Sequence, residues 1–302
     1  MPKGNDKLII SASRRTDIPA FYSEWFINRI RAGFFIKVNP YNPKQRKEIS
    51  LLPPEVAAIV FWSKNPQPLL EYLRLLDQMN YHYLFQFTLN NYGRILEPRV
   101  PPLKERLATF LRLSERIGPD KVLWRYDPIV VSNINSVEDH LEQFQQIARQ
   151  LTGYTRQVTV SLVALYDKVQ ANFKKLTPKS PFRIINLRAA EEREQLSILA
   201  KGLSQIAWES KLRIFSCSEK VDLSEWNISA GSCIDARLMN ELFQLDLKVA
   251  KDKYQRPECG CVSSVDMGCY DTCNFGCSYC YANTSMKTVF RHVDFSAPTL
   301  LG

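Results

Sequence analysis

The sequence predicts an α/β fold in which eight strand–helix units close into a parallel (β/α)8 barrel of the TIM type, as one domain over residues 1–302. Three observations favour this class. The chain has 302 residues, which suits a barrel of about 250 residues with extensions. Eight short runs are apolar on both faces, as buried parallel strands are. Helical patterns with recognisable ends separate most of these runs.

The predicted strands are rich in β-branched and aromatic residues, and most of them end in polar ones. They span residues 8–13, 34–38, 58–63, 83–88, 122–127, 158–162, 212–216 and 261–266. An open, doubly wound sheet is the alternative to a closed barrel. No G-x-G-x-x-G motif follows a strand, which disfavours the dinucleotide-binding form of that alternative.

The predicted helices begin and end at residues typical of helix termini. The first opens with Pro19 and ends before Gly33. Asn65 and Pro66 precede the second, and the pair Ser136 and Asp139 has the spacing of a capping box. The helices are expected over 19–32, 66–79, 102–117, 136–150, 187–208 and 234–245.

Two segments interrupt this alternation. Residues 39–54 are expected to form a hairpin with the second predicted strand. Residues 167–186 combine lysines, prolines and a serine, and are expected to form a long surface loop.

Polar side chains lie where the predicted strands end. They are Arg14, Arg15, Asp17, Ser63, Lys64, Asn65, Gln86, Thr88, Arg125, Asp127, Ser161, Ser216 and Glu219. Any one of them is equally typical of a loop or a helix cap. Because the carboxyl ends of barrel strands meet at one face, the set together predicts a polar active-site mouth.

The eight cysteines all follow residue 216. The N-terminal residues MPKGNDKLIISASRRTD lack the apolar core of a secretion signal, and no window approaches 18 uninterrupted apolar residues. We therefore expect a cytoplasmic protein that does not cross a membrane. In that compartment the thiols indicate metal binding or catalysis rather than disulfides.

Three of these cysteines form a compact motif, Cys273-x3-Cys277-x2-Cys280, and are called the loop cysteines below. Three thiolates on one short loop can hold three irons of a [4Fe–4S] cluster, which leaves the fourth iron without a protein ligand. A closed structural zinc site would require four ligands.

This spacing, with Tyr279 before the last cysteine, resembles the cluster loop of the radical S-adenosylmethionine (SAM) superfamily. The run 277–281 (CSYCY) is also similar to the loop of the spore photoproduct lyases. The resemblance implies that the open iron chelates SAM, whose reductive cleavage gives a 5′-deoxyadenosyl radical that acts on a substrate. It also implies that Tyr279 lies near the adenine.

The position of the motif departs from that superfamily, which places the loop after its first strand. Here the loop follows the last predicted strand, within the cysteine-rich segment 259–281. Because the last strand of a closed barrel neighbours its first, the resemblance implies a barrel that is circularly permuted relative to the usual radical SAM barrel.

Nearly the whole chain resembles the DUF1848 family, a domain of unknown function with a C-terminal cysteine cluster. The resemblance rests on residues 11–19 (SASRRTDIP), 61–66 (FWSKNP) and 124–128 (WRYDP), and on the terminal cysteines.

The SAM-binding residues are inferred from position. The radical SAM superfamily holds the SAM amino group with a Gly-Gly-Glu-like stretch after its second strand, and here that place reads 11–17 (SASRRTD). Ser13 or Asp17 would receive the ammonium, and Arg14 or Arg15 would pair with the carboxylate; pairing of these arginines with a core acid such as Asp127 is the alternative. The strand-end residues Asn65, Gln86, Arg125 and Asp127 would complete the site for SAM and substrate.

Four other cysteines form a second candidate set: Cys217, Cys233, Cys259 and Cys261, called the inner cysteines below. In a barrel they could converge beside the last strand, where four thiolates suit an auxiliary [4Fe–4S] cluster or a structural zinc ion. Scattered buried thiols are the alternative. Candidate radical relays are Tyr126, Tyr166 and Cys217, and Cys269 falls outside both sets.

The formal net charge is +9, with basic clusters at 44–47 and 174–175. A basic surface suits an acidic electron donor of the flavodoxin or ferredoxin type, or a nucleic acid. The sequence therefore leaves two functions open. One is a radical SAM enzyme, and the other is a non-catalytic nucleic-acid-binding protein stapled by zinc or an iron–sulfur cluster.

Overall fold

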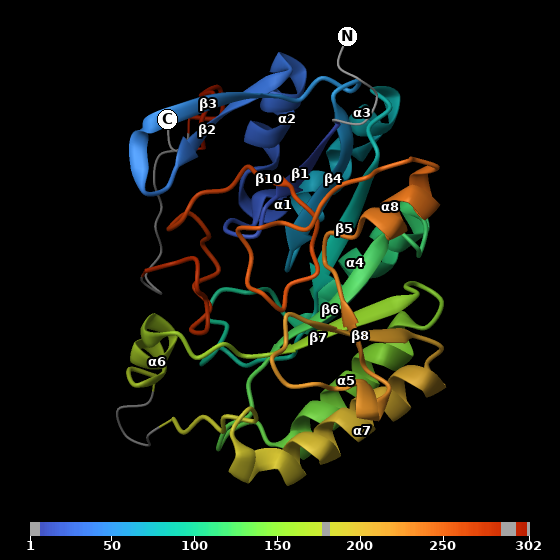
Figure 1. Ribbon diagram of the computed structural model, residues 1–302, viewed down its shortest axis with the longest axis vertical. Helices are drawn as coiled ribbons and strands as arrows, with labels where there is room; N and C mark the ends of the chain where they lie inside the picture. Colours follow the sequence, from blue (N-terminus) through green and yellow to red (C-terminus); the bar gives the residue numbers. More distant parts are fainter. Residues whose placement is uncertain (1–6, 177–181, 285–293, 301–302) are drawn as a thin grey trace.

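Eight parallel strands form one sheet in the computed structural model, which describes residues 7–176, 182–284 and 294–300. Their order across the sheet is β10-β1-β4-β5-β6-β7-β8-β9. The strands are β1 (Leu8–Ala12), β4 (Val56–Ser63), β5 (Tyr83–Thr88), β6 (Val122–Ile129), β7 (Gln157–Leu162), β8 (Arg213–Cys217), β9 (Ser229–Gly231) and β10 (Val265–Asp266). Figure 1 shows that β1 and β4 run in a clearly different direction from β7 and β8, so the sheet is strongly twisted.

The predicted closure of the sheet into a barrel is wrong for the strands that the structure describes. β9 and β10 are its two edges, and they are three and two residues long. β9 pairs with β8 and β10 pairs with β1, and no ladder joins the two edge strands in the described part of the chain. One backbone hydrogen bond, from Val262 N–H to the Ile234 carbonyl at 3.0 Å, joins the chain after β9 to the chain before β10. The architecture is therefore an open parallel α/β sheet whose edges approach each other.

The second predicted strand lies outside this sheet. β2 (Phe34–Asn39) and β3 (Asn42–Ser50) pair with each other in an antiparallel hairpin, which confirms the hairpin expected over 39–54. β3 is exposed over most of its length, so it has no apolar face to bury in the main sheet. The eighth position belongs instead to β9, whose three residues carry no apolar run that the sequence could reveal.

Helices follow the predicted pattern closely. They are α1 (Ile18–Phe21), α2 (Ser23–Ala32), α3 (Leu73–Gln78), α4 (Leu103–Ile117), α5 (Val137–Leu151), α6 (Asp167–Phe173), α7 (Arg193–Glu209) and α8 (Ala236–Phe243), with 3₁₀ turns η1 (Gln67–Tyr72), η2 (Ala190–Glu192) and η3 (Ser224–Trp226). The capping box of Ser136 and Asp139 is confirmed, and α2 ends at Gly33, whose φ of 78° favours glycine. The predicted loop 167–186 contains α6, and its residues 177–181 lie outside the described part.

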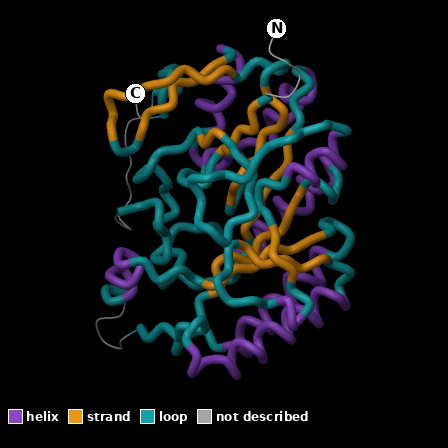
Figure 2. Tube along the Cα trace, in the orientation of Figure 1, coloured by secondary structure: helices purple, strands orange, loops and turns teal. Residues whose placement is uncertain are grey.

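The two faces of the sheet bury different cores. One face, represented by Phe61, Phe85 and Trp124, packs on α2, α4, α5 and α7, and Figure 1 shows α5 and α7 side by side there. The other face, represented by Val60 and Leu123, packs on α8 and on the inner cysteines. Figure 2 shows that loops rather than helices cross much of this second face. No helix in the described ranges is long and apolar enough to span a bilayer.

Candidate functional site: two cysteine groups at one face of the sheet

The end of β10 is fastened to the end of β1 by Asp266. Its carboxylate accepts hydrogen bonds from the hydroxyls of Ser11 (2.9 Å) and Ser13 (2.7 Å) and from the backbone N–H groups of Arg14 and Gly268 (both 2.9 Å). A Cβ atom at Gly268 would lie 1.9 Å from the Ser13 hydroxyl oxygen, so this approach requires glycine. Asp266 thus fixes where the loop with three cysteines begins.

The first half of that loop rests on the turn after β1. The Thr16 hydroxyl donates to the Cys269 carbonyl at 2.9 Å and accepts from the Cys269 N–H at 3.1 Å. The Tyr22 hydroxyl donates to the Thr272 carbonyl at 2.6 Å. The turn that the sequence marked as the SAM-binding segment therefore supports the cysteine loop through its backbone.

The second half of the loop is held by chain segments that follow β5 and β7. The Asn172 amide donates to the Ser278 carbonyl at 3.2 Å, and the Ser278 N–H donates to the Leu96 carbonyl at 3.0 Å. Within the loop, the Asn283 amide donates to the Cys273 carbonyl at 2.5 Å. These bonds fix the loop backbone rather than its sulfur atoms.

The loop cysteines lie in an apolar setting with Tyr92 and Phe275. Burial raises the pKa of all three thiols, that of Cys273 to about 12. A negative charge on Cys273 or Cys280 raises the pKa of Cys277 further, whereas nearby Lys64 lowers it. Three mutually repelling thiols in an apolar setting need a positively charged partner to be thiolates, and a cluster of irons supplies that charge.

No three His, Cys, Asp or Glu side chains within 7–176, 182–284 and 294–300 are arranged to hold a single metal ion. This finding bears on single-ion sites. A [4Fe–4S] cluster binds each cysteine through a different iron, so its ligands surround a volume and do not converge on one point.

Tyr279 makes a contact that the sequence did not reveal. Its hydroxyl donates to the buried carboxylate of Glu97, which also accepts from Lys64 Nζ at 2.8 Å and lies 4.0 Å from Arg106. The Lys64 ammonium lies 5.6 Å from the centre of the Tyr279 ring. Burial, together with the charges of Cys277 and Glu97, raises the pKa of Tyr279 well above its ordinary value. Glu97 follows β5 in a segment without any motif, so nothing in the sequence marked it.

Two residues predicted to bind SAM, Asp17 and Ser13, instead make hydrogen bonds within the protein. Asp17 accepts from the Ala20 N–H (3.0 Å) as the cap of α1, and from the Ser63 hydroxyl and Lys64 N–H (both 2.7 Å) at the end of β4. Burial raises the pKa of Asp17 to about 6, although these hydrogen bonds oppose the shift. Ser13 is bonded to Asp266, as described above. Their geometry is that of structural ties between strand ends.

Three residues of the predicted ring keep unsatisfied polar atoms. Nη2 of Arg14, Oδ1 of Asn65 and Oε1 of Gln86 are buried without a hydrogen-bond partner in the described part of the chain, and the Gln86 amide donates to the Cys233 carbonyl. The guanidinium of Arg15 lies 4.8 Å from the centre of the Tyr270 ring. Buried groups of this kind in a native protein call for a partner that the chain does not provide. Arg14 and Asn65 are therefore the residues of the ring best placed to bind a ligand.

Arg125 and Arg14 lie on the face of the sheet that packs on the inner cysteines. Their guanidinium carbons are 5.1 and 5.4 Å from the centre of the Trp62 ring. Arg125 donates from Nε to Asp127 at 3.0 Å, and Asp127 also accepts from the Ser161 hydroxyl. Despite burial, the Arg125 guanidinium holds the pKa of Asp127 below its usual range.

The structure brings the inner cysteines together from three places in the chain. Cys217 ends β8, Cys233 follows β9, and Cys259 and Cys261 precede β10. The sulfurs of Cys217 and Cys233 are 3.0 Å apart. Cys261 shares side-chain hydrogen bonds with Cys233 and with Cys259, and these bonds hold the pKa of Cys261 below its usual range.

Polar groups of the sheet surround these sulfurs. Arg125 Nη1 donates to Cys233 Sγ at 2.6 Å, and the Ile234 N–H donates to Cys261 Sγ at 3.3 Å. Gln86, another member of the predicted ring, donates to the Cys233 carbonyl at 2.6 Å. Gln86 and Arg125 therefore lie at the inner cysteines rather than at the loop.

The candidate radical relays are scattered. Tyr126 lies on the helix-covered face of the sheet, where its hydroxyl is 2.9 Å from Nδ1 of the buried His140. Tyr166 precedes α6 and is 45% exposed. Cys217 belongs to the inner cysteines. The structure does not bring these three residues together.

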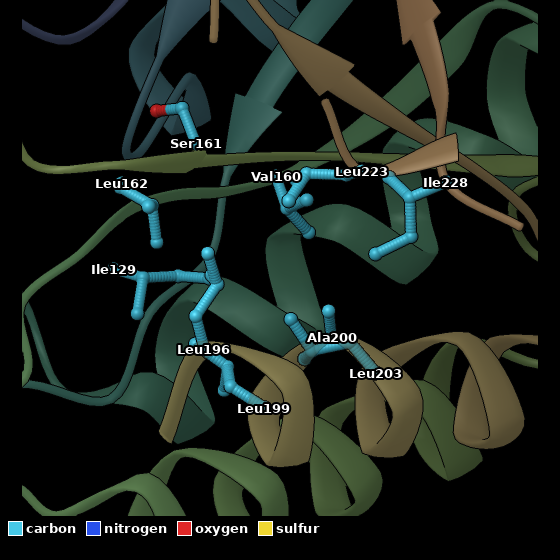
Figure 3. A pocket seen from close by; sticks show the side chains of 10 residues that line it. All are labelled: Ile129, Val160, Ser161, Leu162, Leu196, Leu199, Ala200, Leu203, Leu223 and Ile228. Atoms are coloured by element: carbon cyan, nitrogen blue, oxygen red, sulfur yellow. The ribbon is translucent and has the colours of Figure 1, made fainter. Parts of the chain in front are cut away.

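A cavity between β7 and α7 carries no chemistry. Its lining is apolar apart from Ser161, and it includes Val160, Leu196 and Leu203. Figure 3 shows the Ser161 hydroxyl pointing away from the apolar side chains, consistent with its hydrogen bond to Asp127. This space is a packing gap in the core.

No curated protein matches this sequence significantly. Among solved structures, a similar chain is the "putative alpha-L-fucosidase" from Bacteroides thetaiotaomicron, with 11% identity, a TM-score of 0.35, and coverage of 82% of this chain and 88% of that one. A likeness this low supports no inference. The family model described as "Domain of unknown function (DUF1848)" matches residues 9–282. The match covers both cysteine groups and the strand-end motifs, and the chain belongs to the DUF1848 family.

Proposed function

We propose that this protein is a radical SAM enzyme whose loop cysteines, Cys273, Cys277 and Cys280, hold a [4Fe–4S] cluster. The observation that carries the proposal is the loop itself. Its backbone is fastened on both sides, by Thr16 and by Asn172, while its three thiols have apolar neighbours and burial raises their pKa. When bound, such a cluster with SAM supplies a 5′-deoxyadenosyl radical.

The strand order supports the permutation inferred from the sequence. β10 precedes the loop and pairs in parallel with β1, so the two strands are neighbours although they lie at opposite ends of the chain. In this proposal β10 takes the role of the usual first strand and β1 that of the second.

The side chains around the loop have distinct tasks in this proposal. Arg14 and Asn65, with their unsatisfied atoms, bind the polar end of SAM. Lys64 and Glu97 position Tyr279 through an ion pair and a hydrogen bond. The apolar side chains Tyr92 and Phe275 exclude water from the thiols.

An electron must reach the cluster from outside the chain. The net charge of +9 suits an acidic donor of the flavodoxin or ferredoxin type. We place the reaction in the cytoplasm, where thiols stay reduced.

Anaerobic reconstitution with iron and sulfide, followed by reductant and SAM, tests the proposal. We expect 5′-deoxyadenosine by mass spectrometry from the wild type and from a Cys269→Ser control, which removes a thiol outside both groups. A protein that carries its full complement of iron yet forms no 5′-deoxyadenosine would overturn the enzymatic function.

The β2–β3 hairpin favours the second function, nucleic-acid binding. Lys44, Arg46 and Lys47 are exposed on β3, and Tyr41 at the tip is 88% exposed. Basic residues beside an exposed ring suit phosphates and stacked bases. Affinity for single-stranded DNA should then fall steeply with salt, and a salt slope near zero would exclude this function.

A further inference from the structure

We propose that the inner cysteines, Cys217, Cys233, Cys259 and Cys261, form a second metal centre of four thiolates. This site is separate from the loop cysteines and does not depend on the proposed SAM chemistry. It would take zinc or a [4Fe–4S] cluster, the two groups that four thiolates commonly bind.

The first argument is the pattern of sulfur contacts. Cys233 contacts both Cys217 and Cys261, and Cys261 contacts both Cys233 and Cys259. The four sulfurs therefore form one continuous chain. Disulfides would pair the thiols exclusively, whereas here two of the four have two sulfur neighbours each. Four neighbouring thiols are the donor set that a four-thiolate metal centre uses.

The four sulfurs lie in a row, and in the described part of the chain they are not arranged around a single ion. Binding a metal would therefore require rotation about the Cα–Cβ bonds of these side chains. The four residues already pack in one cluster. Metal binding would release the thiol protons to solvent.

The second argument is charge. Arg125 donates to Cys233 at 2.6 Å, and Arg14 is stabilised by Cys261 and Cys233 as well as by Asp266. Both guanidiniums lie against Trp62. Four thiolates around a divalent ion carry two excess negative charges, which two arginines balance. The Ile234 N–H adds a donor to Cys261 Sγ.

The third argument is position. The inner cysteines lie where the sheet is open, since they come from the end of β8, the chain after β9 and the chain before β10. There the two edges share the single backbone bond from Val262 to Ile234 described above. A metal held by both sides would add a second connection between the edges, beside these hydrogen bonds.

The experiment measures metal in a chain whose loop cysteines are removed together, C273A/C277A/C280A. We expect about one zinc ion, or about four irons with matching sulfide, to remain per chain. Adding C233S and C261S should remove that metal. Adding C269S instead, the matched control, should leave it in place. A brown chromophore identifies the iron form, and a colourless protein with zinc identifies the other.

Loss of metal through misfolding is separated by a measurement on the unaltered protein. Alkylation of the native wild type should spare the inner cysteines until a chelator is added, and mass spectrometry identifies the protected residues. A triple variant that keeps the wild-type circular dichroism but contains no metal would overturn the proposal. So would a Cys217–Cys233 disulfide in the native protein. Neither result would affect the SAM cleavage proposed for the loop.

Discussion

The two cysteine groups of this protein are built in opposite ways. The inner cysteines come from separate segments, have their sulfurs in contact, and face the guanidiniums of Arg125 and Arg14. The loop cysteines come from one short segment, have apolar neighbours, and are held through their backbone. Four neighbouring thiols suit a closed centre whose ligands are all protein atoms. Three thiols on a loop suit a centre that leaves room for a ligand from outside.

The difference shows how the same residue type serves structure in one place and reactivity in another. A closed centre beside the open sheet edges stabilises the fold, so its loss should be seen in unfolding. A centre on the loop contributes chemistry, so its loss should be seen in turnover. The predictions below separate these two roles, from the largest expected effect to the smallest.

Replacing Cys277 with alanine should abolish 5′-deoxyadenosine formation, because the cluster loses one of three protein ligands. The metal of the inner cysteines should remain. Iron, sulfide and zinc analysis beside the SAM cleavage assay checks both statements, with C269S as the control. Simultaneous loss of all metal from folded C277A protein would show that the two groups are not independent.

Replacing Arg125 with methionine should lower the free energy of unfolding by about 3–5 kcal/mol, because it leaves buried Asp127 without its charge partner. It also removes the donor to Cys233. Urea unfolding measures the effect. R125K keeps the positive charge and should lower the free energy of unfolding less than the methionine variant does. Equal loss in both variants would argue against charge as the cause.

Asp17 makes the support of the loop sensitive to pH. Because burial raises its pKa from 3.8 to about 6, the folded chain binds this proton more tightly than the unfolded chain. The contribution of Asp17 to stability is therefore largest below pH 3.8 and is lost as the pH rises through about 6, by about 3 kcal/mol in total. D17N should remove this slope. If the free energy of unfolding of wild type and D17N changed in parallel between pH 4 and 7, Asp17 would not be the cause of this pH dependence.

Replacing Glu97 with glutamine should lower stability by about 2 kcal/mol, since its carboxylate accepts buried bonds from Lys64 and Tyr279. E225Q removes the carboxylate of an exposed pair with Arg193 and should cost less than about 1 kcal/mol. Thermal unfolding of both variants provides the comparison. Equal shifts would mean that the Glu97 contacts contribute no more than a surface pair.

The sequence predicted much of the fold because each strand of the parallel sheet carries its own apolar run. It overestimated closure because apolar runs do not reveal whether the two edge strands meet, and β9 and β10 pair with β8 and β1 but not with each other. The polar residues of β3 made the hairpin predictable. Because these residues are exposed, they also explain why β2 and β3 lie outside the main sheet.

The candidate site was predictable where spacing carries the chemistry, as in the loop cysteines. It was not predictable where partners are distant in the chain. Glu97 and Asp266 look like ordinary loop and strand-end acids, yet one binds Tyr279 and the other fastens β10 to β1. Because side chains alternate along β6, Arg125 lies on the face with the inner cysteines and Tyr126 on the helix-covered face. Which residue takes which face could be known only from the strand register.

Electron paramagnetic resonance of the reduced, iron-loaded protein tests the central claim most directly, because an external ligand can reach only a cluster with an open iron. Addition of SAM should change the signal of the wild type and of C233S/C261S, and should leave any signal of C273A/C277A/C280A unchanged. A wild-type protein with its full complement of iron whose signal does not respond to SAM would contradict the assignment of the loop cysteines.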